Sequence, residues 1–197
     1  PAFGMAEVCI AGSFGGIDEG MRTDFIDPEA LEKEHFAKPA VLKDTARELV
    51  KLGSAVQGLE FRIIDPTNGD VLQDRFVGEL QIRGSSVTPG YFKAPEATAK
   101  VFDGEWFKTG DLAYLVDGDL VLCGRIKDVI IVGGRNLYPQ DIEAGVSDIS
   151  EVRSGNVIAI GIQADQKETI VVIAETKEKG ELDDVRAAIK QSVIESV

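Results

Sequence analysis

Two glycine-punctuated polar clusters hold the residues best suited to chemistry, T-G-D at residues 109–111 and G-R-I-K-D at residues 124–128. The carboxylate of Asp111 can accept hydrogen bonds from both hydroxyls of a ribose. The planar guanidinium of Arg125 can reach the same sugar or its phosphate. The pair therefore predicts a nucleotide site, and the alternative is a salt bridge that ties two hairpins together.

Short apolar segments must position these clusters. Leu120–Cys123 and Val129–Val132 are β-branched or aliphatic, so the second cluster is predicted to lie between two strands. A short helix over Ala94–Phe102 leads to residues 109–111, which are predicted to form a turn. Strands bounded by turn residues predict a small β subdomain, over residues 58–65, 78–84 and 119–123.

The order of these motifs identifies a family resemblance. T-G-D, then G-R-I-K-D, then G-G-R-N-L-Y-P-Q-D-I-E resembles the late core motifs of the adenylate-forming superfamily, which includes acyl-CoA synthetases, luciferases and peptide-synthetase adenylation domains. N-L-Y-P-Q-D-I-E is most similar to the fatty-acyl-AMP ligases. The resemblance implies that Asp111 and Arg125 hold the ribose, and that Lys127 is the hinge of a mobile C-terminal domain.

The opening residues P-A-F-G-M-A-E resemble the family's aromatic-Gly-x-x-Glu motif. The resemblance implies that Phe3, Gly4 and Met5 bind adenine, and that Glu7 holds the Mg²⁺ bound to the phosphates of ATP. Stacking requires only a π surface, glycine allows close backbone approach, and Mg²⁺ accepts carboxylate and phosphate oxygens together. Ala6 stands where many relatives have Thr, which removes a hydroxyl that could touch phosphate. Without the downstream motifs, Phe3 would be interpreted as a core aromatic.

The fold expected from these patterns is α+β. Residues 1–126 are predicted to be the tail of a large N-terminal domain, including the β-barrel-like subdomain, and residues 127–197 a small α/β domain. In the latter, a helix is expected over residues 138–147, strands over 152–162 and 169–176, and a helix from Leu182. Its apolar stripe comprises Leu182, Val185, Ile189 and Val193.

The charged stretch over residues 21–50 is harder to interpret. Asp27 and Pro28 are typical of a helix start, and residues 44–52 have helical spacing. By position the stretch is similar to the insertion that separates fatty-acyl-AMP ligases from CoA ligases, which restrains domain movement. The alternative is a variable surface excursion.

Three aromatic residues further along the chain are predicted to pack rather than to act. Tyr91 and Phe92 are predicted to be mainly packing residues, and Tyr114 is predicted to be a core residue rather than to line the site.

Composition excludes several classes of function. A formal charge of -13 argues against binding of nucleic acid or anionic membranes over the general surface. The sequence has no apolar run long enough to span a bilayer, so a cytoplasmic protein is expected. Cys9 and Cys123 are interpreted as reduced packing residues. Because His35 is the single histidine, the sequence argues against a protein-bound zinc site and against a His-based catalytic triad.

The resemblance implies a parent enzyme that joins a fatty acid to ATP, releases pyrophosphate and holds an acyl-adenylate. The acceptor would be the phosphopantetheine arm of an acyl carrier protein, or CoA in a CoA ligase. A non-catalytic binding module with the adenylation fold is the third hypothesis. The family's phosphate-binding loop and its C-terminal lysine do not occur in the 197 residues, so this polypeptide alone is expected not to form acyl-adenylates.

Overall fold

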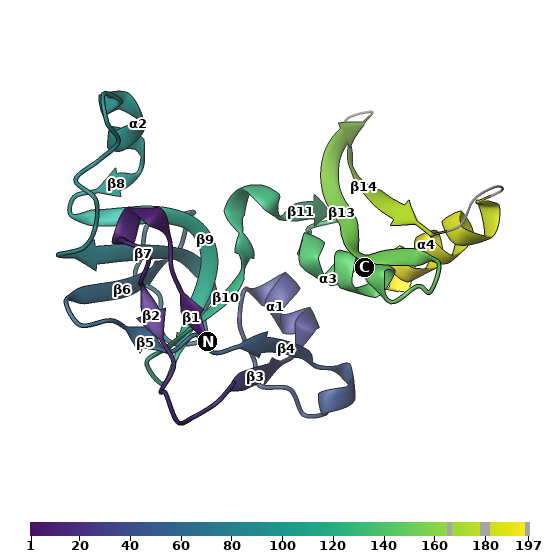
Figure 1. The fold of residues 1–197 in the computed structure, drawn as a ribbon, viewed down its shortest axis with the longest axis horizontal. Coiled ribbons are helices and arrows are strands. Elements are labelled where there is room, and N and C mark those ends of the chain that lie inside the picture. Colours follow the sequence, from purple (N-terminus) through teal and green to yellow (C-terminus); the bar gives the residue numbers. More distant parts are fainter. Residues whose placement is uncertain (165–166, 178–181, 196–197) are drawn as a thin grey trace. The chain divides into compact units, whose positions relative to one another are not determined.

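The computed structural model describes residues 1–164, 167–177 and 182–195, and the chain divides into two compact units, Pro1–Ile126 and Lys127–Val197 (Figure 1). Strands predominate and the helices are few and short, so the predicted α+β fold is confirmed. Among the described residues, none of the helices combines the length and the apolar character needed to cross a membrane.

The first unit, Pro1–Ile126, is built on a five-stranded antiparallel sheet in the order β10-β9-β7-β6, with β8 pairing to β9. A three-stranded sheet, β1-β2-β5, and a two-stranded sheet, β3-β4, accompany it. The main core lies beneath β6, β7, β9 and β10 and confirms the predicted β subdomain. The elements of this unit are β1 Ala2–Phe3, η1 Ala6–Val8, β2 Ser13–Phe14, β3 Thr23–Ile26, α1 Pro28–Glu34, η2 Lys43–Thr45, β4 Arg47–Val50, β5 Ser54–Ala55, β6 Leu59–Ile64, β7 Gly78–Gly84, α2 Pro95–Lys100, β8 Phe102–Asp103, β9 Trp106–Val116, β10 Asp119–Arg125 and η3 Ile126–Asp128, which continues into the second unit.

Strands β9 and β10 form the hairpin that carries the first polar cluster and, at the end of β10, Gly124 and Arg125 of the second, whose remaining residues form η3. Asp117 and Gly118 have φ values of 54° and 84°, as a two-residue hairpin turn with the right-handed strand twist requires. Residues 109–111 lie inside β9 as a bulge, because three residues of β9 face only Leu80 of β7. Gly110, with φ of 72°, makes this bulge possible. The predicted turn at residues 109–111 is therefore wrong, since the chain reverses later, after Val116.

The segment from residue 21 to residue 50 is folded and packed. Helix α1 begins as predicted, because the side chain of Asp27 accepts hydrogen bonds from the backbone N–H groups of Glu29 and Ala30 at 3.0 and 3.3 Å. The helix predicted over residues 44–52 is wrong. A 3-10 turn is followed by strand β4, which pairs antiparallel with β3 along its whole length. Pairing with a partner more than 20 residues away overrides the weak helical spacing.

In the second unit, Lys127–Val197, the described residues form two antiparallel hairpins and two helices. Its elements after η3 are β11 Ile130–Val132, β12 Arg135–Leu137, α3 Pro139–Ser147, β13 Val152–Ala164, β14 Lys167–Thr176 and α4 Asp183–Glu195. Gly133 and Gly134 have φ values of 60° and 81° and form the turn between β11 and β12. The predicted apolar stripe is confirmed for Val185, Ile189 and Val193, which pack against the core of this unit. Leu182 lies just before the start of α4.

The two cysteines differ in environment. Cys123 is buried, as predicted. Cys9 is exposed, so its interpretation as a packing residue is wrong. The reason is local, because Cys9 ends the η1 turn with φ of 57°, and η1 turns only Val8 into the core.

Candidate nucleotide-binding site

Asp111 and Arg125 face each other across the β9–β10 hairpin. They are directly paired in the register of the two strands, and Nε of Arg125 donates to Oδ1 of Asp111 at 2.9 Å. The Asp111 side chain is 14% exposed and the Arg125 side chain 48%. The two residues do form a salt bridge, as the alternative predicted. The salt bridge lies within one hairpin, so the prediction that it ties two hairpins together is wrong. A carboxylate and a guanidinium held side by side can together receive the hydroxyls of a sugar.

The bulge in β9 fixes the backbone at Asp111. The hydroxyl of Thr109, which is buried, donates to the carbonyl oxygen of Leu80 at 2.8 Å. The hydroxyl oxygen of Thr109 in turn accepts the backbone N–H of Asp111 at 3.0 Å. Sequence reasoning treated the threonine only as part of a motif. The structure shows that it anchors the acidic residue to the central strand β7.

The Phe3–Glu7 segment lies on the same core as the hairpin. Phe3 is only 8% exposed and belongs to the cluster that also contains Val8 and Ala113. Its ring packs over Gly12, where a Cβ would come within 2.7 Å of a ring carbon. Phe3 is therefore a core residue in the structure, as the residues alone suggest. Its contact with adenine stays a prediction.

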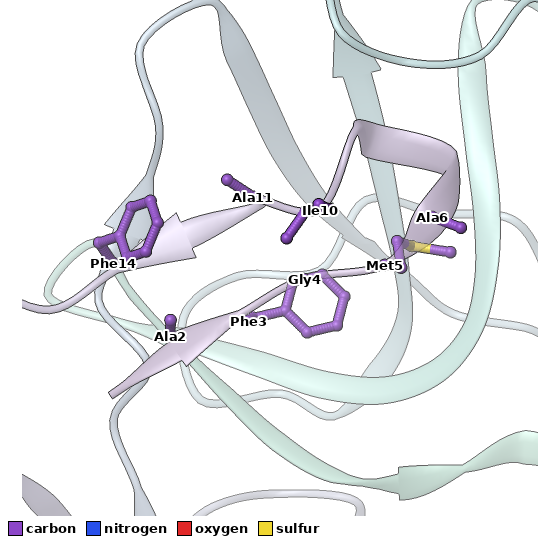
Figure 2. Close-up of a pocket in the computed structure, with 8 residues that line it drawn as sticks. All are labelled: Ala2, Phe3, Gly4, Met5, Ala6, Ile10, Ala11 and Phe14. Carbon is purple, nitrogen blue, oxygen red and sulfur yellow. The ribbon is translucent and has the colours of Figure 1, made fainter.

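An open apolar pocket of about 450 Å³ adjoins this segment (Figure 2). Phe3, Gly4 and Met5 line it from one side, and Ile10 and Phe14 from the other. A Cβ on Gly4 would lie 1.7 Å from the carbonyl oxygen of Ile10, so only glycine permits this approach. The pocket offers an open, mainly apolar surface, which suits an aromatic base.

Glu7 is half-buried and has a partner that sequence reasoning missed. The hydroxyl of Tyr91 donates to Oε1 of Glu7 at 3.0 Å. Loss of hydration and this hydrogen bond raise the pKa of the Tyr91 phenol. Tyr91 and Phe92 are 39% and 89% exposed, so their prediction as packing residues is wrong. Both belong to a loop before α2, and the proline-glycine turn that precedes them gave no sign of the contact.

The residues present fit a magnesium ion that is held mainly by its substrate. Within the described ranges, no group of three histidine, cysteine or acidic side chains could hold a metal ion. Glu7 supplies a single carboxylate with its second oxygen outside the hydrogen bond to Tyr91. Mg²⁺ is typically bound by one or two carboxylates together with phosphate oxygens and water. The donor set therefore suits Mg²⁺ that arrives with ATP.

Lys127 occupies the middle of the short η3 turn and is exposed. The boundary between the two compact units falls immediately before it. Its backbone is therefore part of neither a long helix nor a strand. Movement about this residue stays a prediction.

Known proteins resemble the chain over nearly its whole length. No protein-family model matches it. A putative acyl-CoA synthetase of Caulobacter vibrioides is 37% identical, over 98% of this chain and 34% of the relative. A medium-chain-fatty-acid–[acyl-carrier-protein] ligase of Moorena producens is 35% identical, over 90% and 32%. A solved structure from a study of fatty acyl-adenylate ligases of E. coli and L. pneumophila has a TM-score of 0.83 and 31% identity, over 97% and 35%.

The fold is that of adenylate-forming enzymes, because the structural neighbours come from fatty acyl-adenylate ligases and from a protein solved with phenylalanyl-adenylate. The chain belongs to the adenylate-forming superfamily. It spans about a third of the length of the relatives that it matches.

Proposed function

We propose that this chain is part of an ATP-dependent fatty-acyl-AMP ligase. The enzyme would join a fatty acid to ATP, release pyrophosphate and hold the acyl-adenylate for transfer to an acyl carrier protein. The observation that carries the proposal is the register-paired Asp111 and Arg125, 2.9 Å apart on a hairpin whose motifs occur in family order. Names of the relatives support the ligase class.

In this proposal the protein mostly positions its substrates. The fatty-acid carboxylate attacks the α-phosphorus in line with the departing pyrophosphate. Asp111 accepts from the ribose hydroxyls, and Arg125 orients that carboxylate while it reaches the sugar. Phe3, Gly4 and Met5 provide the adenine surface, and Glu7 holds Mg²⁺, which neutralises charge on the phosphates.

Lys127 is proposed as the pivot between adenylation and acyl transfer. A change in a few backbone torsions is enough for hinge motion. In the longer ligase, Lys127→Pro, which fixes one torsion, should retain fatty-acid-dependent pyrophosphate release and lose most acyl transfer. Retention of both half-reactions would contradict the pivot.

The acceptor separates two versions of the proposal. The Moorena relative is named for an acyl carrier protein and the Caulobacter relative for CoA, so each acceptor has a named precedent. Radiolabelled fatty acid should appear on carrier protein and not in a CoA thioester. The opposite result would favour the CoA ligase.

We also propose that the 197 residues alone do not complete adenylation. Pyrophosphate release should be absent with this chain and present with the longer ligase. Turnover by the isolated chain would contradict this part. Absence of pyrophosphate release from the longer ligase across a panel of fatty acids would instead favour a non-catalytic binding module.

A further inference from the structure

The loop between β7 and α2 holds Glu7 at two points. The backbone N–H of Thr88 donates to the carbonyl oxygen of Glu7 at 2.7 Å, and the hydroxyl of Tyr91 donates to its carboxylate at 3.0 Å. The second contact joins residues 84 positions apart in the sequence. Main chain and side chain of Glu7 are therefore fixed by one loop.

Tyr91 is itself held in place from its backbone. The hydroxyl of Thr98 accepts the N–H of Tyr91 at 2.9 Å and donates to the carbonyl oxygen of Ala94 at 2.9 Å. A Cβ on Gly90 would lie 2.6 Å from the Thr98 methyl group, and Gly90 has φ of 146°, so glycine is needed for this approach. The start of α2 thus orients the tyrosine.

The exposure of Tyr91 argues against a simple packing role. The residue is 39% exposed and its neighbour Phe92 is 89% exposed, so this loop does not fill the core. The tyrosine instead directs its polar end to a carboxylate. A phenol that donates to a carboxylate makes a charge-assisted hydrogen bond, which restricts the rotamers of a side chain that is otherwise free to turn.

We infer that Tyr91 is a positioning residue that holds one oxygen of Glu7 so that the other faces the metal of Mg·ATP. This inference rests on the proposed function, because it takes Glu7 as the carboxylate that meets the metal. Tyr91 does not touch the substrate. It restricts the rotamers of the Glu7 side chain before binding, so less conformational entropy is lost when the metal binds.

The test compares Tyr91→Phe, Glu7→Ala and the double variant in the longer ligase, with Phe92→Leu as the matched neighbour. Tyr91→Phe should raise the Mg²⁺ concentration for half-maximal pyrophosphate release roughly fivefold, the factor that one lost hydrogen bond represents, with the KM for fatty acid unchanged. The double variant should need no more Mg²⁺ than Glu7→Ala. Phe92→Leu should behave as the wild type.

A second readout needs neither metal nor substrate. In the 197-residue chain, Tyr91→Phe and Glu7→Ala should each lower Tm by about 2–4 °C, and the double variant by no more than the larger single effect. Fully additive losses would overturn the inference. The inference would also fail if Glu7→Ala raises the Mg²⁺ requirement and Tyr91→Phe leaves it unchanged. That result would leave the proposed function intact. If Glu7→Ala itself leaves the Mg²⁺ requirement unchanged, the role of Glu7 in the proposed function fails, and this inference with it.

Discussion

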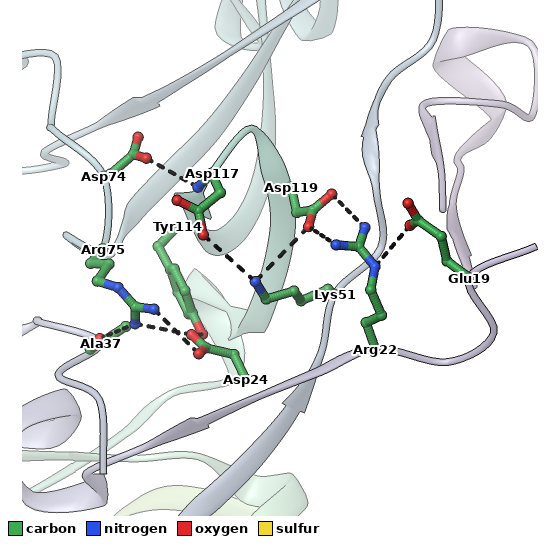
Figure 3. A network of polar contacts seen from close by, with 10 residues as sticks. All are labelled: Glu19, Arg22, Asp24, Ala37, Lys51, Asp74, Arg75, Tyr114, Asp117 and Asp119. Atoms are coloured by element: carbon green, nitrogen blue, oxygen red, sulfur yellow. Dashed lines mark hydrogen bonds and ion pairs between the residues drawn. The ribbon is translucent and has the colours of Figure 1, made fainter. Parts of the chain in front are cut away.

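The hydroxyl of Tyr114 donates to Oδ2 of Asp24 at 2.8 Å in the interior of the first unit (Figure 3). Tyr114 belongs to β9 and Asp24 to β3, so the bond joins the β9–β10 hairpin to the segment from residue 21 to residue 50. Arg75 adds two hydrogen bonds to the same carboxylate. The core role predicted for Tyr114 is thus confirmed, and the segment is attached through buried polar groups.

Tyr114→Phe should lower the free energy of unfolding by about 1–3 kcal/mol, because it leaves a buried carboxylate oxygen with one donor fewer. Denaturant titration of the chain measures this loss. Lys33→Ala is the matched control, since it breaks only an exposed Lys33–Glu29 pair within α1 and should change stability by less than about 0.5 kcal/mol. Equal effects of the two variants would contradict the anchoring role.

The same tyrosine predicts a pH dependence at alkaline pH. Burial, and then the bond to Asp24, raise the pKa of Tyr114 far above its ordinary value of about 10. Because the unfolded chain ionises first, the contribution is intact below pH of about 10 and is lost as pH rises from there. Stability measured between neutral pH and pH of about 11 should fall less steeply in Tyr114→Phe. Identical slopes would contradict the prediction.

Trp106, the single tryptophan, contacts two guanidinium groups, with Arg62 at 4.4 Å and Arg83 at 4.6 Å from its ring centre. Arg62 also donates twice to the side-chain oxygen of Gln81, which is only 2% exposed. Arg83 pairs instead with Glu60, which is exposed. Sequence patterns did not distinguish the two arginines.

Arg62→Ala should therefore cost about 1–3 kcal/mol of stability, because a buried amide loses its donor. Arg83→Ala should cost less than about 1 kcal/mol. Unfolding followed by Trp106 fluorescence measures both. The reverse order of the two losses would refute this account of the sheet face.

The sequence correctly predicted the features that depend on residues close together in the chain. The Asp27 cap, the strands β6, β7 and β10 and the stripe on α4 each depend on neighbouring residues, and each was predicted correctly. Strand β4 was missed because its partner β3 is distant in sequence. Longer-range contacts gave no local signal at all, as the bond from Tyr91 to Glu7 shows.

The site follows the same rule. The motifs predicted that Asp111 and Arg125 act together, but their direct pairing depends on the bulge at residues 109–111 and on a second irregularity between Leu122 and Gly124. Each bulge shifts the register of β9 or β10, and a shift by one residue would turn a side chain to the opposite face. Spacing in the sequence does not determine such shifts.

The ribose contact of Asp111 is the claim on which the proposed function depends most. Calorimetric titration of the longer ligase with ATP and with 2′-deoxy-ATP tests it, in the wild type, in Asp111→Asn and in Asp117→Asn, a control at the far end of the same hairpin. The wild type and Asp117→Asn should bind ATP roughly tenfold more tightly than 2′-deoxy-ATP, as loss of a hydrogen bond to a charged group implies. Asp111→Asn should bind the two nucleotides with nearly equal affinity. Equal affinities in the wild type, or an unchanged preference in Asp111→Asn, would contradict the proposed nucleotide site.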